Sequence, residues 1–322
     1  MRTNFLFLLL IILTWFSCGN IFTNGEDDLD YREEMRTFVG EISAYAKEQN
    51  PDFAVIPQNG HPLILRNGNP ATAYLNAVDA LAQESLFFGY GGMDQPTPAR
   101  ETNNLLRLLN IGKDANKAIL VTDYVTTSFK VNNSINQNTA LGFTPFAAPK
   151  RELTVIPART FPLTGENDND ITQLSEAKNF LYLLNMEEFD SRDDFISSVQ
   201  NTNYDVIIMD AFYGSRVFTP QEVEQLRQKE NGGTRLVISY MSIGEAEDYR
   251  YYWNDEWRQG NPEWLVRENP NWRGNYKVQY WNPDWKAIIL GNEQSYLQLI
   301  LDAGFDGVYL DIIDGFEFFE NQ

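Results

Sequence analysis

The chain has 322 residues, of which 43% are hydrophobic, and its formal net charge is -20. This length fits one large domain or two small ones, and the negative charge argues against nucleic acid or anionic lipid as a partner, because phosphate is bound by Lys and Arg. The single His and single Cys cannot build a Cys/His zinc site, and we find no phosphate-binding loop, dinucleotide fingerprint or Gly-x-Ser-x-Gly elbow, so we expect no cofactor and assign acid–base chemistry to Asp, Glu or Tyr.

The N-terminus resembles a targeting segment. Arg2 is followed by the uncharged run 5–16, which is too short to span a bilayer and fits the apolar core of a secretory signal peptide, 1–17. Cys18, between Ser and Gly, resembles the modified residue of a bacterial lipoprotein box, so we predict its lipidation; simple cleavage nearby is the alternative. The polar stretch 18–30 is then a tether. We therefore expect a secreted lipoprotein of the bacterial outer membrane or periplasm that contacts a membrane only through its lipid.

The next part of the chain alternates predicted helices and strands. Residues 31–50 read as an amphipathic helix, because Met35, Phe38, Val39 and Ile42 recur at three- and four-residue spacing. The elements expected after it are a strand at 53–57, a helix at 71–84, a strand at 85–90, a helix at 101–113, a strand at 118–124, a long loop at 126–142, a short extra strand at 153–156 and a linker at 161–178.

The second half continues this alternation. Thr219, Pro220 and Glu222 form a strong helix start, with Thr as cap and Pro in the first position. The run 236–240 is a buried strand that breaks into an acidic loop carrying Arg250. The expected strands are 180–184, 205–209, 236–240, 276–281 and 306–310, and the expected helices lie at 191–199, from 219 onward and at 285–301.

Strands that alternate with helices imply a parallel sheet, and eight strong strand candidates predict a single-domain (β/α)8 TIM barrel over 31–322. A doubly wound open sheet is the alternative. The predicted order begins with a helix that no strand precedes and ends soon after the strand 306–310. We therefore predict a circularly permuted barrel in which the linker near 161–178 joins the original ends; a truncated reading frame is the competing explanation.

Polar side chains follow the predicted strands at their C-terminal ends, which converge on one face of a barrel. Several carboxylates at one mouth suit glycoside hydrolysis, in which one acid protonates the leaving oxygen and a second is the nucleophile or base. Carbohydrate binding without turnover, and a metal-dependent hydrolase with Mg²⁺ or Ca²⁺ on the same oxygens, are the alternatives. The candidates are Gln58, Asn59, Asp123, Asn185, Asp210, Glu245, Glu247, Asp311 and Asp314, with Tyr240, Tyr280 and Arg250.

Aromatic residues favour a sugar ligand. Six of the seven Trp lie between residues 253 and 285, and aromatic rings stack on the apolar faces of sugars. Trp281 directly follows a predicted strand and is the one that we expect to face a ligand. Packing of a long loop over the barrel is the alternative role for the others.

Several long motifs resemble one family. SYMSIGEAEDYRYYW, NPEWL, NYKVQYWNPDWK and GFDGVYLDIIDGFEFF, together with FAVIPQNG and VTDY, resemble the extracellular barrel proteins of glycoside hydrolase family 114, named for endo-α-1,4-polygalactosaminidase. The likeness covers nearly all of 31–153 and 179–319. In the relatives the segment like FAVIPQNG follows the one like GVYLDIID, whereas here it comes first, which supports the permutation.

The resemblance implies a hydrolase acting on a polysaccharide, with a galactosamine-containing polymer as the candidate substrate and acids at the positions of Glu247, Asp311 and Asp314. Relatives with that activity read Val-Glu-Pro-Asp where this chain has Tyr309 two residues before Asp311, so Tyr309 replaces a carboxylate. We take Glu247 and Asp311 as the acid/base pair, with Asp210 and Glu245 as further catalytic candidates, in a protein expected to be a monomer. The substrate-binding candidates are Asp314, Arg250, Tyr240, Tyr280, Trp281, Gln58, Asn59 and Asp123.

Overall fold

The computed structural model describes residues 29–158 and 163–322. The predicted signal peptide, Cys18 and all but the end of the tether lie outside these residues. Residues Tyr31–Gln322 form one compact unit. None of the described helices is long and apolar enough to cross a membrane.

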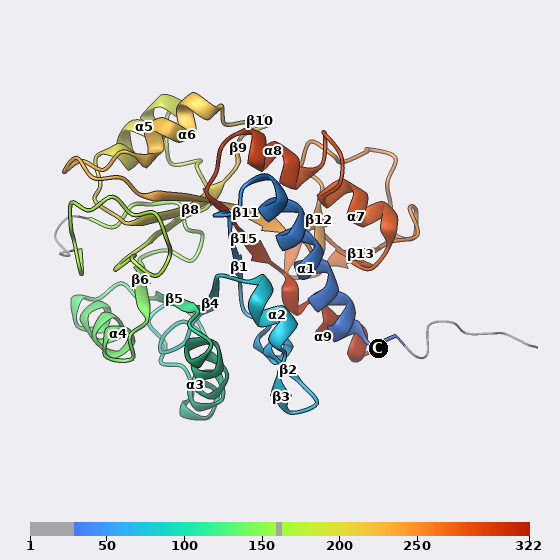
Figure 1. The fold of residues 1–322 in the computed structure, drawn as a ribbon, viewed down its shortest axis with the longest axis horizontal. Helices are drawn as coiled ribbons and strands as arrows, with labels where there is room; N and C mark the ends of the chain where they lie inside the picture. The colour runs from blue at the N-terminus through green and yellow to red at the C-terminus, as the bar shows by residue number, and fades with distance from the viewer. Residues whose placement is uncertain (1–28, 159–162) are drawn as a thin grey trace, which may run out of the picture. The chain divides into compact units, whose positions relative to one another are not determined.

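Two parallel sheets form the centre of this unit, with helices outside them (Figure 1). The larger sheet has the strand order β1, β15, β11, β8, β7, and the smaller has the order β4, β5, β6. The larger sheet consists of β1 (Ala54–Pro57), β15 (Gly307–Asp311), β11 (Leu236–Ser242), β8 (Val206–Asp210) and β7 (Leu181–Leu183). The smaller sheet consists of β4 (Ala80–Glu84), β5 (Ala118–Tyr124) and β6 (Thr144–Ala148).

The two sheets meet at β1 and β4. Gln58 and Ala82 form a single parallel bridge there, and the amide of Asn59 donates to the Ala82 carbonyl at 2.8 Å. No ladder joins β6 to β7 among the described residues. The fold is therefore a mixed α/β structure with a central parallel sheet, as predicted in outline, but its ladders form two sheets rather than one continuous closed ring.

Helices cover the outer faces of the sheets. The predicted helix 31–50 is α1 (Tyr31–Gln49), and Met35, Phe38, Val39 and Ile42 are all fully buried, as their spacing predicted. Thr219 caps α6 (Pro220–Arg227) in a complete capping box with Glu222. The remaining helices are α2 (Thr72–Ala77), α3 (Ala99–Asp114), α4 (Ser128–Ala140), α5 (Arg192–Gln200), α7 (Pro283–Ile289), α8 (Tyr296–Asp302) and α9 (Phe316–Glu320), with short 3-10 turns at His61–Ile64 and Ile313–Gly315.

The segment 71–90 differs from the prediction of a long helix followed by a strand. The helix α2 ends at Ala77, and β4 occupies the residues assigned to the rest of the helix. Asp79 separates the two, since its backbone amide donates to the Val55 carbonyl and its carboxylate accepts from the Val55 amide, at 2.9 and 2.8 Å. Ser85, with φ of 58°, then ends the strand. Pairing with β1 and β5 overrides the local helical pattern.

The segment 126–148 also differs from the prediction. The expected long loop is the helix α4, followed by the unpredicted strand β6. Ser134 and Asn138 of α4 donate to the buried Asp123 of β5 at 2.6 and 3.2 Å. These tertiary hydrogen bonds stabilise a helix whose Asn, Ser and Thr content disfavours helix on its own.

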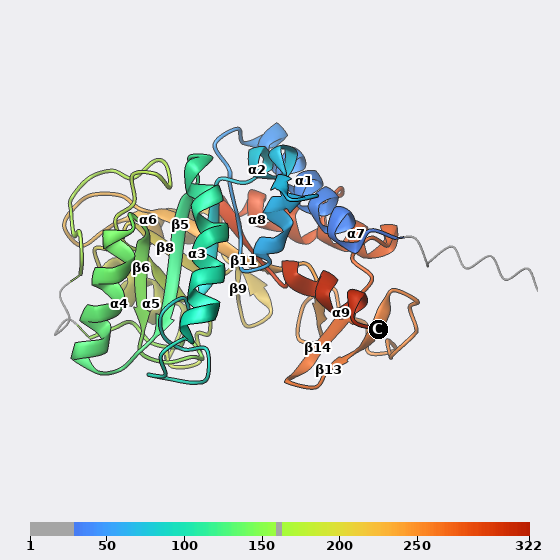
Figure 2. The ribbon, with the colours of Figure 1, turned by 90° about the horizontal axis from the view of Figure 1, so that it is seen from below.

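The predicted strand 276–281 does not belong to the parallel sheets. It overlaps β14 (Trp272–Val278), which pairs antiparallel with β12 (Glu245–Glu247) and β13 (Leu265–Asn269). Figure 2 shows β13 and β14 beside α9, apart from the parallel strands. The short strand expected at 153–156 is irregular chain, and the helix expected at 285–301 is two helices, α7 and α8, separated at Gly291 with φ of 98°. The eighth parallel strand is β6, which was not predicted from the sequence.

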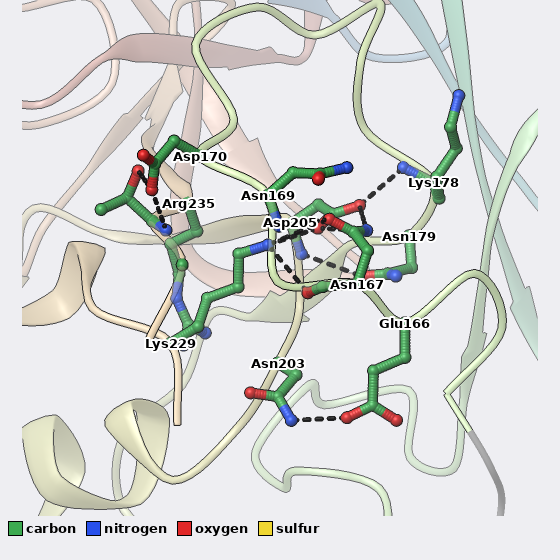
Figure 3. A network of polar contacts seen from close by, with 12 residues as sticks. Glu166, Asn167, Asn169, Asp170, Lys178, Asn179, Asn203, Asp205, Lys229 and Arg235 are labelled. Carbon is green, nitrogen blue, oxygen red and sulfur yellow. Dashed lines mark hydrogen bonds and ion pairs between the residues drawn. The ribbon is translucent and has the colours of Figure 1, made fainter. Parts of the chain in front are cut away.

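The described part of the predicted linker, 163–178, contains neither helix nor strand. Figure 3 shows how it is held at the N-terminal ends of β7 and β8. Asp205 and Lys229 form a fully buried ion pair of 2.9 Å, and Asp205 also accepts from the Asn167 side chain and the Lys178 amide. A network of charged groups thus fixes this segment to the sheet.

Candidate functional site

Acidic and phenolic side chains gather at the C-terminal ends of the parallel strands. Glu84, Asp210 and Asp311 are the last residues of β4, β8 and β15. Tyr240 of β11 is paired in register with Asp210 on one side and Tyr309 on the other. Parallel strands end at the same edge of the sheets, so residues far apart in the sequence meet there. We call this edge, with the residues at the ends of β4, β8, β11 and β15, the mouth.

Arg250 joins two of these carboxylates. Its Nη1 donates to both oxygens of Asp210 at 2.8 and 2.7 Å, and its Nε donates to Glu247 Oε2 at 2.5 Å. Burial disfavours its charge, but Asp210 and Glu247 together raise the pKa of Arg250 well above its usual value. Burial raises the pKa of Asp210, and Arg250 opposes this shift. Charge-assisted hydrogen bonds of this kind fix both carboxylates in one geometry. We call Arg250, Asp210 and Glu247 the Arg250 cluster.

The Tyr240 hydroxyl links Glu247 to Asp311. Its oxygen lies 2.9 Å from Asp311 Oδ2 and 3.5 Å from Glu247 Oε1. Tyr249 donates to Glu247 Oε1 at 2.7 Å, and the Glu247 amide donates to the Tyr252 hydroxyl at 3.1 Å. Glu247 is 1% exposed. The proposed acid and base therefore lie on two sides of one phenol.

Asp311 lacks the cation that Glu247 has. Its carboxyl accepts from the Ile312 amide at 2.8 Å and from Tyr240, and none of the ion pairs among the described residues includes it. Burial, followed by the charges of Glu84 and Asp314, raises the pKa of Asp311 to about 8. Asp311 is therefore protonated at neutral pH, the state that a general acid needs.

Glu245 and Asp314 lie in a different environment. Glu245 is fully buried and pairs with Lys277 at 2.5 Å and with Asn269 at 2.8 Å. Burial, then the charge of Glu317, raises the pKa of Asp314 to about 6, against the opposing charge of Lys277. Both acids therefore interact with Lys277 rather than with Arg250.

Asp123 lies away from the mouth. Successive side chains of a strand point to opposite faces, and Tyr124 contacts Glu84 while Asp123 faces α4. Asp123 accepts from the amides of Phe87 and Phe88 at 2.9 and 3.1 Å, in addition to its two α4 donors. The structure does not bring it to the other candidates.

Tyr280 and Trp281 are packing residues in this structure. The buried Tyr280 hydroxyl donates to the Tyr31 carbonyl at 2.7 Å, and the Trp281 ring lies 5.1 Å from that of Tyr31 and 4.7 Å from that of Phe319. Most of the other Trp also pack together, since Trp257, Trp264 and Trp285 form a chain of ring contacts. Trp285 also lies 5.8 Å from the ring of Tyr252, whose hydroxyl accepts from the Glu247 amide.

Gln58 and Asn59 lie at the mouth, where the two sheets meet. The Tyr182 hydroxyl donates to Gln58 Oε1 at 3.5 Å, and Asn59 Oδ1 accepts from the amide of Glu84 at 3.2 Å. Asn185 borders a cavity of about 350 Å³ next to the Arg250 cluster. Asp210, Arg250, Tyr249, Tyr251, Phe212 and Glu187 also line this cavity.

Glu84, Tyr124, Tyr182 and Tyr309 belong to the mouth but were not among the sequence candidates. The prediction placed Glu84 at the end of a helix, Tyr124 and Tyr182 looked like ordinary strand residues, and Tyr309 was noted only as the replacement of a family carboxylate. Burial raises the pKa of Tyr182, and the charges of Tyr309, Asp311 and Glu84 add to this shift. A correct register for β4 would have placed Glu84 beside the end of β5.

Among the described residues, no group of three or more His, Cys, Asp or Glu side chains is arranged to hold a metal ion. The carboxylates of the mouth lie around one guanidinium and several phenols.

Residues 164–322 match the model of glycoside-hydrolase family GH114. Asp210, Glu247, Arg250 and Asp311 all lie within this GH114 region, whereas Glu84 lies outside it. The match supports a glycoside hydrolase.

Three curated relatives each align with 38–47% of this chain. The uncharacterized protein MJ1477 of Methanocaldococcus jannaschii is 39% identical over 155 residues, 47% of this chain and 42% of that protein. An uncharacterized protein of Deinococcus radiodurans is 37% identical over 127 residues, 39% of each chain, and one of Thermotoga maritima is 36% identical over 124 residues, 38% of this chain and 37% of that protein. The matches thus cover less than half the length of these relatives.

Proposed function

We propose that the protein is a glycoside hydrolase that cleaves a polysaccharide, with Asp311 as general acid and Glu247 as nucleophile or base. The observation that carries this proposal is the unequal environment of the two carboxyl groups. Glu247 forms an ion pair of 2.5 Å with Arg250, whereas Asp311 has no ion pair among the described residues and its pKa is raised to about 8. Two acids with separated proton affinities are what glycoside hydrolysis requires.

In the proposed reaction Asp311 donates its proton to the glycosidic oxygen as the bond to the anomeric carbon breaks. As nucleophile, Glu247 attacks that carbon, and a water that gives its proton to Asp311 then releases the sugar and restores the Glu247 carboxylate; as base, Glu247 removes a proton from an attacking water. Asp210 holds the other edge of Arg250, so the guanidinium stays against Glu247 while charge develops. Tyr240 fixes the distance between the two reacting carboxyl groups.

The substrate that we propose is a galactosamine-containing polymer, cleaved within the chain. The net charge of -20 favours a cationic ligand over an anionic one. Tyr249 and Tyr251, which are 59% and 38% exposed, line the cavity beside Arg250 and are suited to stack on sugar rings. Glu187 at the same cavity offers a carboxylate to an amino group.

The test is the release of new reducing ends from galactosamine-containing and other polysaccharides. Glu247→Gln and Asp311→Asn should each lower the rate at least ~100-fold, the scale of losing acid–base catalysis. The exposed Glu256→Gln and Asp255→Asn are matched controls and should keep the wild-type rate. Unchanged rates in the Glu247 and Asp311 variants would remove the assignment.

Two other outcomes identify the alternatives. Glycan binding with no reducing ends from any polymer would indicate a carbohydrate-binding protein, which the replacement of a family carboxylate by Tyr309 favours. Loss of activity in a chelator would indicate a metal-dependent hydrolase.

We also propose that the protein is secreted, that Cys18 carries a lipid, and that the domain is a permuted (β/α)8 barrel. The packing of α1 against α2, α8 and α9 and the pairing of β1 with β15 support the permutation. Metabolic labelling with a fatty acid should mark the wild type and spare Cys18→Ala. Label that persists on the variant would contradict the lipid anchor.

A further inference from the structure

The Glu247 carboxylate has no free face for a substrate. The residue is 1% exposed, and it is not among the residues that line the cavity beside the Arg250 cluster. Its Oε1 accepts from Tyr249 at 2.7 Å and lies 3.5 Å from the Tyr240 hydroxyl, and its Oε2 accepts from Arg250 at 2.5 Å. Donors of the protein therefore occupy both carboxylate oxygens. A direct reaction of Glu247 with a sugar carbon or a water would require one of these donors to leave.

Tyr249 connects Glu247 to the cavity. The residue is 59% exposed and lines the cavity of about 350 Å³ together with Asp210 and Arg250. Its hydroxyl donates to Glu247 Oε1, and the guanidinium carbon of Arg250 lies 5.1 Å from the centroid of its ring. One side chain thus borders the cavity and contacts the buried carboxylate.

Tyr249 is a neutral phenol at neutral pH. The burial of its hydroxyl end raises the pKa of Tyr249, the charge of Glu247 adds to this shift, and Arg250 opposes it. Such a phenol does not lose its proton alone. It can accept a proton from one side while it gives its own to a hydrogen-bonded carboxylate on the other. The hydrogen bond of 2.7 Å to Glu247 provides the second half of this exchange.

We propose that Tyr249 is a catalytic residue that relays a proton from the attacking water to Glu247. The inference rests on the proposed function and assigns Glu247 the role of base within it. The water oxygen bonds to the anomeric carbon and gives a proton to the Tyr249 oxygen, while Tyr249 gives its own proton to Glu247 Oε1. The glycosidic bond breaks, and its oxygen takes the proton of Asp311. The sugar gains the hydroxyl of the water, and Glu247 ends protonated.

Tyr240 offers the path by which the site returns to its starting state. After the reaction Glu247 holds a proton that Asp311 has lost. The Tyr240 hydroxyl lies 3.5 Å from Glu247 Oε1 and 2.9 Å from Asp311 Oδ2. It takes the proton of Glu247 and gives its own to Asp311, so the cycle needs no further reactant than water and the glycan.

The direct test is Tyr249→Phe in the full chain, assayed by the reducing ends released from a galactosamine-containing polymer. The variant keeps the ring and loses the hydroxyl. Its kcat should fall at least ~100-fold, the scale of losing acid–base catalysis, and its KM should stay within about twofold because the ring still borders the cavity. A kcat within about twofold of the wild-type value would overturn the proposal.

Tyr45→Phe is the matched control. The Tyr45 hydroxyl also donates at 2.7 Å, to Gln298 Oε1, and this contact joins α1 to α8. Its loss should leave the rate of hydrolysis unchanged. Tyr249→Phe combined with Glu247→Gln should be no slower than the slower single variant, because one relay is broken only once. Losses that multiply would show two independent roles and would overturn the relay.

A measurement on the wild type covers the case in which Tyr249→Phe does not fold. Direct attack by water inverts the configuration at the anomeric carbon. Proton NMR of the first products should therefore show the inverted anomer. Retained configuration would mean attack by a group of the protein and would overturn the relay.

The outcomes distinguish the relay from the proposed function. If the wild type hydrolyses no glycan, the proposed function fails and the relay fails with it. If the wild type is active and Glu247→Gln is slow while Tyr249→Phe is fast, the proposed function stands and the relay alone is overturned.

Discussion

Arg250 divides the carboxyl groups of the mouth into two kinds. Asp210 and Glu247 share its guanidinium, whereas the carboxyl groups of Glu84 and Asp311 accept from phenols and a backbone amide and form no ion pair among the described residues. A single buried cation thereby gives carboxyl groups of one cluster two different environments. This difference comes from which side chains the strand ends bring together, not from the residue types.

Replacing Arg250 should destabilise the fold in a pH-dependent way. Arg250→Met leaves two buried carboxylates without a cation and should lower the free energy of unfolding at pH 7 by about 3–5 kcal/mol. The loss should shrink at acidic pH, where Asp210, whose pKa is raised by burial, takes up a proton. Urea unfolding at pH 7 and at pH 4 measures both effects. A loss of equal size at the two values would contradict the charge argument.

The raised pKa of Asp311 predicts how stability depends on pH. A carboxyl group whose pKa rises on folding, here from 3.8 to about 8, binds its proton more tightly in the folded state. Its contribution to stability is fully present below pH 4 and is lost as pH rises to about 8. Asp311→Asn should therefore gain stability relative to wild type between pH 5 and pH 9, as thermal unfolding would show. A constant difference across this range would contradict the raised pKa.

At the scale of elements, strand alternation decides which acids reach the mouth. Glu84 and Tyr124 point inward together, while Asp123, one residue earlier on β5, points to α4. From the sequence, Asp123 near the end of a predicted strand looked equivalent to Asp210 and Asp311. The exact end of the strand and its register determine the face, and a shift of one residue exchanges the two faces.

Replacing Asp123 should lower the stability of the fold and leave the rate of hydrolysis nearly unchanged. Asp123→Asn replaces one acceptor oxygen by a donor facing Ser134 and Asn138, which should cost about 1–3 kcal/mol of unfolding free energy. The rate of a folded sample should stay within about twofold of wild type, in contrast to Asp311→Asn. Denaturation and reducing-end assays on the same preparation test this. A large loss of rate with unchanged stability would return Asp123 to the substrate-binding candidates.

The elements that the sequence missed share one physical cause. α4 is rich in Asn, Ser and Thr, and β6 contains Pro145, so neither has a strong local signal. Their hydrogen bonds run to β5, through Asp123 and the parallel ladder. By contrast α1 and α6, whose apolar spacing and cap are local features, appear as predicted.

At the scale of the whole molecule, the two edges of the parallel sheets have different chemistry. The C-terminal edge carries the acids and phenols of the mouth, with a cavity beside them. The N-terminal edge holds the buried Asp205–Lys229 pair and the irregular segment 163–178 (Figure 3). In folds of parallel strands the first edge carries activity and the second carries stability.

The buried Asp205–Lys229 ion pair should therefore contribute more to the free energy of unfolding than an exposed ion pair with the same N–O distance. Lys229→Met leaves Asp205 without its cation and should cost about 3–5 kcal/mol. Lys150 forms an exposed ion pair of 2.9 Å with Glu188, and Lys150→Met should cost under about 1 kcal/mol. Urea denaturation compares the two variants. Similar costs would show that burial does not decide the strength of the Asp205–Lys229 contact.

The sequence alone determined the α/β class, the hydrophobic face of α1, the cap of α6 and the candidate acids in the second half of the chain. These follow from spacing, capping residues and motifs, which are properties of short stretches. The tertiary structure decided that β6 rather than 276–281 is a parallel strand, that the buried Asp123 faces α4, and that Glu84 lies at the same edge of the sheets as Asp311. Those outcomes depend on pairing between distant strands, since the register of one strand against the next fixes the face on which each side chain lies.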